Sequence, residues 1–301
     1  ISSLEISPDS HWLATAGNSQ DVLLWDLSGQ NPAENPLQLT GHEAAVNSVV
    51  FSPDSRWLVT GSNDRTARRW DLTAADPSQA SLALRGHLQP VLALAVSSDG
   101  RWLVTGSSDH TARIWDLDLA DPNKAPVLLS GHDGSIRSIL VDPENRWVIT
   151  ASEDQTARRW QIAQKNPSYL PDILLGHQGA VSALAFTSQG KILASKDSGD
   201  IFLWDMDGDD FARNLLFHSD QSERQLVAAF SLDGRWLAAA GGDASIRLWQ
   251  TDKPNFKETP LLLKGPSDRV SKLVFSPENR YLVSGGEEGQ VWLWDFGSEK
   301  P

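Results

Sequence analysis

One segment recurs along this chain at nearly constant spacing. It is clearest from Gly41 to Asp71, which reads GHEAAVNSVVFSPDSRWLVTGSNDRTARRWD, and it returns from Gly86 and from Gly131. A segment that recurs at such a period is one structural unit copied in tandem, and a single copy cannot bury its own apolar face. Successive copies end on tryptophans spaced 45 residues apart, with one interval of 44: Trp25, Trp70, Trp115, Trp160, Trp204, Trp249 and Trp294.

Each copy has the pattern of short strands joined by tight turns. In the copy that starts at Gly41, alternate apolar residues predict a strand over 46–51. A Pro-Asp pair and an Asn-Asp pair then form turns, and they separate two further strands, the second of which ends at Trp70. A polar loop and a Leu-rich segment over 82–84 predict a fourth strand, and the equivalent outer strands are expected at 127–129 and 173–175.

The beginning and the end of each copy resemble those of a known family. Copies open with Gly-His, and they close with Trp-Asp at 25, 70, 115, 204 and 294 or with Trp-Gln at 160 and 249. Together with the period, these pairs resemble the WD-repeat β-propeller family, in particular bacterial proteins with highly similar tandem repeats. The resemblance implies that each unit is one four-stranded antiparallel blade and that the chain is an all-β, seven-bladed β-propeller.

The repeats divide the chain into seven blades of a single propeller over 1–301. The residues after Asp295 are too few for a loop and a fourth strand. We therefore expect the last blade to lack its outer strand, the chain to be a fragment of a larger polypeptide, and Val291–Asp295 to be an edge strand open to pairing with another chain. The expected blades are 1–40, 41–85, 86–130, 131–175, 176–217, 218–264 and 265–301.

Composition narrows the range of partners and chemistry. The formal net charge is −13, which argues against nucleic acid or an anionic membrane as the main partner. The chain has no Cys, so it has no disulfide, no thiolate nucleophile and no Cys-ligated zinc. The acidic loop 205–210 lacks the distal Glu of a calcium loop. We expect no metal and no cofactor. No apolar run is long enough to span a membrane, and we expect a cytoplasmic protein whose targeting region is not present in the chain.

A set of four polar residues recurs in copies two to four. The resemblance implies that a hydroxyl joins a His side chain to a Trp side chain and that a carboxylate holds the His. The sets are His42, Thr60, Asp64 and Trp70; His87, Thr105, Asp109 and Trp115; and His132, Thr150, Asp154 and Trp160. Later copies depart from this set: copy five has His177, Ser195 and either Asp197 or Asp200, copy six has Ala239 and Asp243, and copy seven has Ser284 and Glu288 with no His.

These sets permit two interpretations. A His beside a carboxylate and a hydroxyl has the composition of a nucleophile with its base and orienting acid. However, three copies on three blades cannot all be active sites, and a buried, satisfied polar network mainly makes a fold rigid. The structural interpretation is favoured, so we call these sets tetrads.

Arg69 and Arg159 occupy a strand position where most copies carry Ile or Leu. Such an Arg either extends past a small neighbour to solvent or pairs with a carboxylate. We expect extension to solvent, past Ala67 and Ala157. An aromatic residue also follows the first turn of most copies, and it is expected to cover the gap between blades rather than to stack sugars or bases. These aromatic residues are Trp12, Trp57, Trp102, Trp147, Trp236 and Tyr281.

Two segments vary between copies while the framework repeats. One is the turn that contains the tetrad Asp, and the other is the start of the innermost strand. The resemblance implies that these residues line the top opening of the propeller, where partners dock. Such variation fits a surface adapted to one ligand, and it fits neutral drift equally well. The candidates are Asn47, Asn63, Arg65, Leu92, Ser108, His110, Arg137, Glu153, Gln155 and Ser182. Arg65, Leu92, His110 and Arg137 are the expected main contacts, because Arg and apolar anchors dominate binding energy.

Taken together, these patterns indicate a non-catalytic scaffold or sensor module that binds a protein or peptide, within a larger bacterial multidomain signalling protein. Two alternatives remain open. The chain could be a purely structural or autoregulatory domain that docks within its own polypeptide, or an enzyme with a pocket on the channel face. The sequence has no Gly-rich phosphate loop, no Gly-x-Ser-x-Gly and no His-Glu-x-x-His, so an enzyme is the least favoured.

Overall fold

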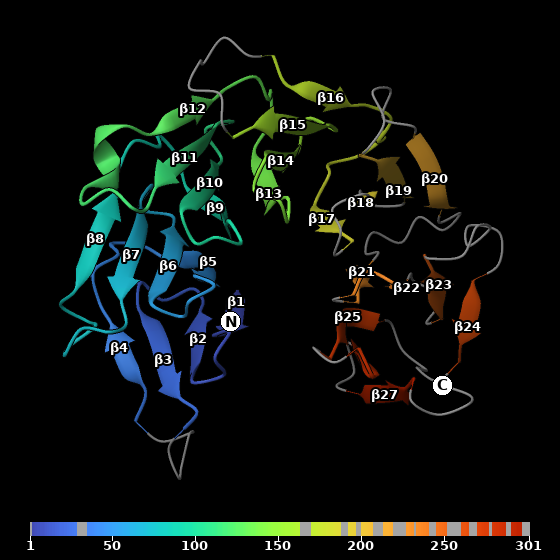
Figure 1. Ribbon diagram of the computed structural model, residues 1–301, viewed down its shortest axis with the longest axis horizontal. Helices are drawn as coiled ribbons and strands as arrows, with labels where there is room; N and C mark the ends of the chain where they lie inside the picture. The colour runs from blue at the N-terminus through green and yellow to red at the C-terminus, as the bar shows by residue number, and fades with distance from the viewer. Residues whose placement is uncertain are drawn as a thin grey trace. The chain divides into compact units, whose positions relative to one another are not determined.

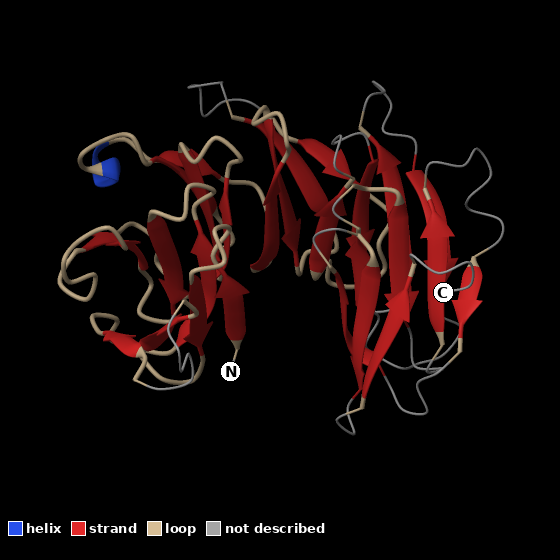
Figure 2. Ribbon diagram, turned by 60° about the horizontal axis from the view of Figure 1, so that its bottom comes forward, coloured by secondary structure: helices blue, strands red, loops and turns tan. Residues whose placement is uncertain are grey.

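Strands dominate the regular structure of the protein (Figure 2). The computed structural model describes residues 2–28, 35–162, 170–187, 192–196, 200–206, 213–218, 227–231, 233–240, 245–251, 260–264, 270–276, 279–286 and 290–296. These ranges contain 27 β-strands and one short 3₁₀ helix, η1 (Pro122–Lys124). None of the described residues belongs to a helix long and apolar enough to cross a membrane.

The strands form seven antiparallel sheets, and within each sheet every strand pairs with the next strand along the chain (Figure 1). Six sheets have four strands, and the last has three among the described residues. Up-and-down sheets of four strands are the units from which β-propellers are built. We therefore call the sheets blades one to seven in chain order.

The chain separates into two compact units, Ile1–Leu174 and Leu175–Pro301. The first unit contains four blades. Their strands are β1 (Ser3–Ile6), β2 (Trp12–Ala16), β3 (Val22–Asp26) and β4 (Leu37–Leu39); β5 (Val46–Phe51), β6 (Trp57–Ser62), β7 (Ala67–Asp71) and β8 (Ser81–Leu84); β9 (Val91–Val96), β10 (Trp102–Ser107), β11 (Ala112–Asp116) and β12 (Val127–Leu129); and β13 (Ile136–Val141), β14 (Trp147–Ser152), β15 (Ala157–Gln161) and β16 (Asp172–Leu174).

The second unit contains three blades. Their strands are β17 (Ala183–Phe186), β18 (Ile192–Lys196), β19 (Asp200–Asp205) and β20 (Arg213–His218); β21 (Val227–Phe230), β22 (Trp236–Ala240), β23 (Ile246–Gln250) and β24 (Leu261–Leu263); and β25 (Val270–Phe275), β26 (Tyr281–Gly286) and β27 (Val291–Asp295). In β27, Val291 and Leu293 are 72% and 61% exposed, so this strand presents apolar side chains on the surface of its unit.

The sequence pattern predicted the inner strands correctly, since β5 covers the residues 46–51 expected to form one. The outer strand expected at 173–175 is wrong by one residue, because β16 is Asp172–Leu174. Asp172 enters the ladder opposite Arg159, and its carboxylate accepts a hydrogen bond from Arg159 Nε at 2.9 Å. This side-chain pair extends the strand by one position toward the N-terminus, where apolar spacing gave no signal.

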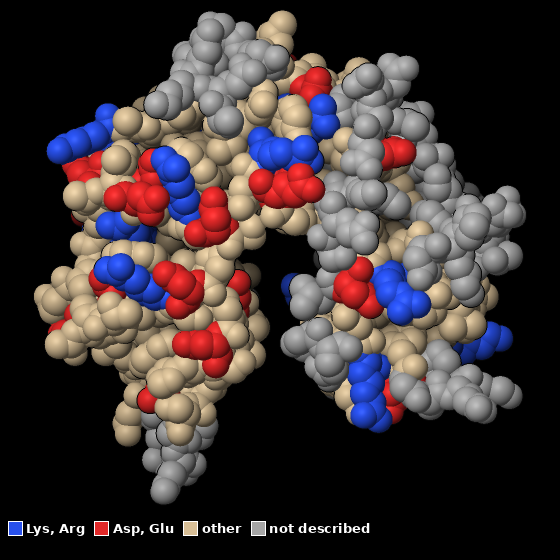
Figure 3. Space-filling view, in the orientation of Figure 1, with Lys and Arg blue, Asp and Glu red and all other residues tan. Residues whose placement is uncertain are grey.

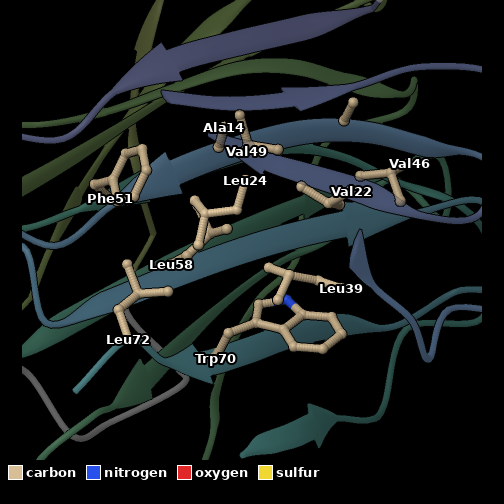
Figure 4. Packing of buried hydrophobic residues seen from close by; sticks show 11 residues of the cluster. Ala14, Val22, Leu24, Leu39, Val46, Val49, Phe51, Leu58, Trp70 and Leu72 are labelled. Atoms are coloured by element: carbon tan, nitrogen blue, oxygen red, sulfur yellow. The ribbon is translucent and has the colours of Figure 1, made fainter. Parts of the chain in front are cut away.

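The core of the first unit lies between neighbouring blades. Figure 4 shows Leu24 and Leu39 of the first blade gathered with Leu58 and Trp70 of the second. All four side chains are at most 1% exposed. Burial of a large apolar side chain contributes about 1.5–3 kcal/mol, so each blade is held chiefly by the blade beside it.

Close packing between blades also explains one glycine inside a strand. A Cβ on Gly106 of the third blade would lie 2.6 Å from Ile136 Cγ2 of the fourth. That distance is too short for two carbon atoms, so the two sheets approach each other closely only because this side chain is absent.

Candidate binding face and the buried networks beneath it

His42 of the second blade belongs to a chain of side-chain hydrogen bonds that runs from Asp64 to Trp70. His42 Nδ1 lies 2.7 Å from Asp64 Oδ2, and His42 Nε2 lies 2.7 Å from Thr60 Oγ1. Trp70 Nε1 donates to the same hydroxyl oxygen at 3.0 Å. The network therefore joins the loop before β5 to the two strands β6 and β7.

The donors and acceptors of this network can be assigned from chemistry. An ionised carboxylate only accepts hydrogen bonds, so the proton of the His42 ring lies on Nδ1. The Nε2 atom then accepts from the Thr60 hydroxyl, which accepts in turn from the Trp70 indole N–H. Every polar atom in this chain has a partner, so the network can be buried without an unsatisfied group.

Asp64 also fixes the turn between β6 and β7. Its Oδ1 accepts from the Thr66 hydroxyl at 2.6 Å and from the Thr66 amide at 2.8 Å. Its Oδ2 accepts from the Glu43 amide at 3.0 Å in addition to His42. One carboxylate thus holds both the turn and the loop that carries the His.

The third and fourth blades repeat this geometry. The His Nδ1 atom lies 2.9 Å and 2.7 Å from the Asp carboxylate, and the His Nε2 atom lies 2.7 Å from the Thr hydroxyl in both. The Trp indole donates to that hydroxyl at 3.0 Å and 2.8 Å. The residues are His87, Thr105, Asp109 and Trp115 in the third blade, and His132, Thr150, Asp154 and Trp160 in the fourth.

In the first and fifth blades the described residues show part of the same network. In the first blade, Trp25 Nε1 donates to Thr15 Oγ1 at 3.1 Å. In the fifth, Ser195 takes the place of Thr, with His177 Nε2 at 2.7 Å and the Trp204 indole at 2.6 Å. Asp197 and the side chain of Asp200, the expected carboxylates of this blade, lie outside the described residues.

The sixth and seventh blades differ further. Ala239 is buried in the hydroxyl position of the sixth blade, as the sequence requires. Ser284 of the seventh blade is 1% exposed, and its hydroxyl has no hydrogen-bond partner in the part of the chain that the structure describes. Asp243 and Glu288, the acids expected in these two blades, lie outside the described residues, as do residues 207–210 of the acidic loop.

Burial and hydrogen bonding change the pKa of the tetrad carboxyl groups in opposite directions. Burial alone would raise the pKa of Asp64, but hydrogen bonds from Thr66, from the Glu43 amide and from His42 outweigh it and lower the pKa to about 2. The pKa of Asp154 is lowered in the same way, against the effect of its burial. Burial also lowers the pKa of His42 and of His132, which favours their neutral rings.

The tetrads are unsuited to catalysis on an external substrate. His42, His87 and His132 are at most 7% exposed, and each Nε2 is occupied by a hydroxyl that also serves the indole. A nucleophilic hydroxyl would need access to substrate and a base free to take its proton. In the part of the chain that is described, no three His, Asp or Glu side chains form a group that could hold a metal ion.

Above the tetrads, three turns present side chains in an unusual backbone conformation. Arg65, His110 and Gln155 have φ values of 72°, 68° and 68° and are exposed. They stand at equivalent positions of the second, third and fourth blades, directly after the tetrad Asp. A left-handed conformation costs an L-residue with a side chain roughly 1–2 kcal/mol, and glycine adopts it freely. We call this end of the blades the tetrad face.

Several of the other predicted side chains of the tetrad face are already bonded to neighbouring groups. Asn47 Nδ2 donates to Asn63 Oδ1 and to the Val91 carbonyl, both at 2.9 Å, so it bridges two blades. Arg137 forms an ion pair with Glu153, with Nε donating to Oε1 at 2.8 Å. Ser108, Leu92 and Ser182 also lie at the surface, and Ser182 belongs to the second unit.

Sequence reasoning missed one residue of this face. Leu88 follows the tetrad His of the third blade and is 72% exposed. Its amide donates to Asp109 Oδ2 at 2.9 Å, which fixes its place beside the tetrad. The sequence could have indicated this residue, because its position varies between copies as the other candidate positions do. The equivalent residues of the second and fourth blades are Glu43 and Asp133.

The expectation that Arg69 and Arg159 extend to solvent is wrong. Arg69 is 8% exposed, and its guanidinium lies 4.1 Å from the centre of the Trp57 ring. Arg159 stacks in the same way on Trp147 at 3.9 Å and pairs with Asp172 at 2.9 Å. The flat face of each tryptophan holds the guanidinium inside the blade, so the cation does not need to reach water.

Several of the charged side chains on the surface lie in pairs of opposite sign. Figure 3 shows Lys and Arg side chains beside Asp and Glu side chains over the visible face, rather than one area of a single sign. Two of the pairs are Arg56 with Asp71 at 3.2 Å and Arg101 with Asp116 at 3.0 Å. In both pairs the acid is the Asp of a closing Trp-Asp, so this motif residue has a charge partner on the turn before the second strand.

The blade architecture and the tetrad geometry define a β-propeller of the repeat type, and comparison with protein families gives the same class. The family model described as "WD domain, G-beta repeat" matches residues 1–26, 34–71, 78–116, 124–161, 169–205, 218–250 and 258–295. The chain therefore belongs to the WD40 repeat family. Propellers of this family are generally non-catalytic scaffolds for protein interactions. A search of curated proteins finds no match.

Replacing Thr105 with Val should destabilise the third blade. Val has the shape of Thr but cannot hydrogen-bond, so His87 Nε2 and Trp115 Nε1 would both lose their partner. Each buried unsatisfied group costs about 1–3 kcal/mol, and we expect a loss of about 2–5 kcal/mol, measured by amide exchange of β10 and by chemical unfolding. Thr105→Ser keeps the hydroxyl and should lose far less. Equal losses in the two variants would contradict the assigned role of the hydroxyl.

Acid should weaken the fold through the tetrad carboxylates. The pKa of Asp64 is about 2 in the folded chain, below the value of about 3.9 in an unfolded chain. The unfolded state therefore binds more protons in this window, and the free energy of unfolding falls as pH decreases from about 4 toward 2. Asp64→Asn should be less stable at pH 7 and should show a shallower loss over that window. A pH dependence identical to that of the parent chain would contradict the account.

Proposed function

We propose that this chain is a non-catalytic scaffold or sensor module of a larger bacterial multidomain signalling protein, and that it binds a protein or peptide on the tetrad face. In this proposal the seven blades over 1–301 form one propeller in the cytoplasm, with the last blade lacking its outer strand. The observation that carries the proposal is the left-handed conformation of Arg65, His110 and Gln155 at equivalent exposed turns.

Strain of this kind supports a functional use of the side chains. The turns at the opposite end of the blades also have a left-handed residue, but there it is Ser55, Gly100 or Asn145. Glycine and asparagine tolerate this conformation well, and serine is small. On the tetrad face the same conformation is imposed on long side chains in three successive blades, and backbone strain at exposed positions is typical of functional sites.

The chemistry of the face suits a peptide with polar and apolar groups. The Arg65 side chain has no hydrogen bond or ion pair among the described residues, so its guanidinium is available to a partner. Leu88 is exposed, and Leu92 is half-buried at the start of β9. Arg and apolar anchors contribute most to protein interfaces. Arg137 is a weaker candidate than the sequence suggested, because Glu153 already neutralises it.

The net charge of −13 and the paired surface charges support a protein or peptide as partner, rather than nucleic acid or a membrane. Pairing of another chain along β27 is a further possible contact of the proposed module. The alternative in which the face docks within its own polypeptide uses the same residues, and the experiment below separates the two through the identity of the partner. No described group of side chains favours the enzyme alternative.

The triple variant Arg65→Gly, His110→Gly and Gln155→Gly tests the proposal. Relief of the left-handed strain should keep stability or raise it by up to about 1 kcal/mol per site, measured by chemical unfolding. Binding to a partner isolated by cross-linking in the source cell and then purified should weaken at least tenfold. Mass spectrometry of the cross-linked product distinguishes a separate protein from another segment of the same polypeptide.

Ser10→Gly is the matched control, because Ser10 has φ 62° and lies on the opposite end of the first blade. It should relieve the same kind of strain and leave partner binding unchanged. A triple variant that binds the partner as tightly as the parent chain would overturn the proposal and assign the variation on the tetrad face to drift.

A further inference from the structure

A pocket opens between the second and third blades, at the end of the blades opposite to the tetrad face. Its volume is about 630 Å³. The side chains of Trp57 and Arg69 and the segment at Leu117 form its inner wall, and Asp54, Asp99 and Asp118 lie around it. The pocket is separate from the face proposed above, because the turn before β6 and the turn after it lie at opposite ends of that strand.

Arg69 is a buried cation that forms no ion pair with a carboxylate of the described residues, although Asp71 interacts with its charge at longer range. Its residue is 8% exposed, and its Nη1 donates to the Leu117 carbonyl at 2.9 Å. Its Nε is buried and has no hydrogen-bond partner among the described residues, and no described carboxylate lies within ion-pair distance of the guanidinium. Stacking on Trp57 offsets part of the cost of burying this charge.

Arg159 shows what the same arrangement looks like when it is complete. It occupies the equivalent position in β15, stacks on Trp147 at 3.9 Å, and donates Nε to Asp172 Oδ2 at 2.9 Å. In the ladder, Asp172 is the residue opposite Arg159. The residue opposite Arg69 is Leu82. The second blade therefore has the cation and the aromatic platform of the fourth blade but not its carboxylate.

Packing alone does not require an arginine at this position. The equivalent residues of other blades are apolar and are buried without any charge; they are Leu24, Ile114, Leu203 and Leu248. A buried cation without an anion is unfavourable unless something compensates it. Because the guanidinium forms part of the wall of an open pocket, the missing anion can come from outside the chain.

We propose that this pocket binds the carboxylate of an acidic peptide, which pairs with the Arg69 guanidinium from the pocket and so supplies the anion that Asp172 supplies to Arg159. An ionised guanidinium forms strong, charge-assisted hydrogen bonds with a carboxylate. The proposal does not depend on partner binding at the tetrad face.

The acids around the pocket define the ligand further. Asp54 Oδ1 accepts from the Ser52 hydroxyl and Asp99 Oδ1 from the Ser97 hydroxyl, so each acid is held in place by its own turn. Their negative charges disfavour a ligand that is only anionic. Arg56 also lines the pocket but pairs with Asp71, and Asp118 lies 3.7 Å from Arg101. Asp54 and Asp99 are therefore the acids that favour a ligand with an ammonium or guanidinium group, directed outward while its carboxylate faces Arg69. A peptide with neighbouring acidic and basic residues has this chemistry.

Nitrogen-15 NMR of arginine side chains tests the site in the full chain, with the dipeptide glutamyl-lysine as probe. The Arg69 Nε–H resonance should shift in a saturable manner, and that of Arg159 should stay in place because Asp172 already occupies it. Glutaminyl-lysine with an amidated C-terminus, which lacks both carboxylates, should give at least a tenfold weaker response. Equal responses to the two dipeptides, or no shift at Arg69, would overturn the proposal.

Two variants keep the test independent of folding. Arg69→Leu copies the apolar residue of other blades and should abolish the response. Leu82→Asp copies the fourth blade and should give Arg69 an internal carboxylate partner. The Arg69 Nε–H resonance should remain observable in this variant, and it should no longer shift when the probe is added. Arg159→Leu is the matched control and should respond as the parent chain does. A site that prefers inorganic phosphate to glutamyl-lysine would also overturn the assignment to a carboxylate.

Discussion

The structure depends on a single hydroxyl in each of the regular blades. In the second blade, Thr60 Oγ1 accepts from the indole of Trp70 and is bonded to the ring of His42. The His lies 18 residues before the Thr and the Trp lies 10 residues after it, and the third and fourth blades have the same two spacings. A buried network with no spare donor tolerates little change in these spacings, and this explains why the repeat is so regular there.

This framework leaves the two ends of the blades free to differ. The tetrad Asp holds the turn through its own oxygens, so the next residue can be Arg65, His110 or Gln155 although its backbone is strained. At the other end, stacking on a tryptophan allows an arginine to replace an aliphatic residue inside a blade. Recognition chemistry can therefore vary from blade to blade while the interior stays constant.

The strands and the tetrads could be predicted from the sequence, but the contacts of individual charged side chains could not. Strands such as β5 and the tetrads follow from residues that recur at fixed spacing, so each copy supports the interpretation of the others. The environments of Arg69 and Arg159 do not follow from spacing, because they are set by the residue opposite on the outer strand, Leu82 or Asp172. Arg137 and Glu153 were each predicted to contact a binding partner. The structure shows that they form an ion pair with each other, which their spacing in the sequence does not indicate.

The most direct test of this account is the position of the proton on the tetrad histidines. Long-range nitrogen–proton NMR of the imidazole rings distinguishes Nδ1–H from Nε2–H. We predict the Nδ1–H form for His42, His87 and His132 at neutral pH, with each Nε2 accepting from a threonine hydroxyl and the indole N–H of the matching tryptophan protected from exchange. Rings protonated at Nε2, with rapidly exchanging indoles, would contradict the claim that one hydroxyl joins the strands of each blade.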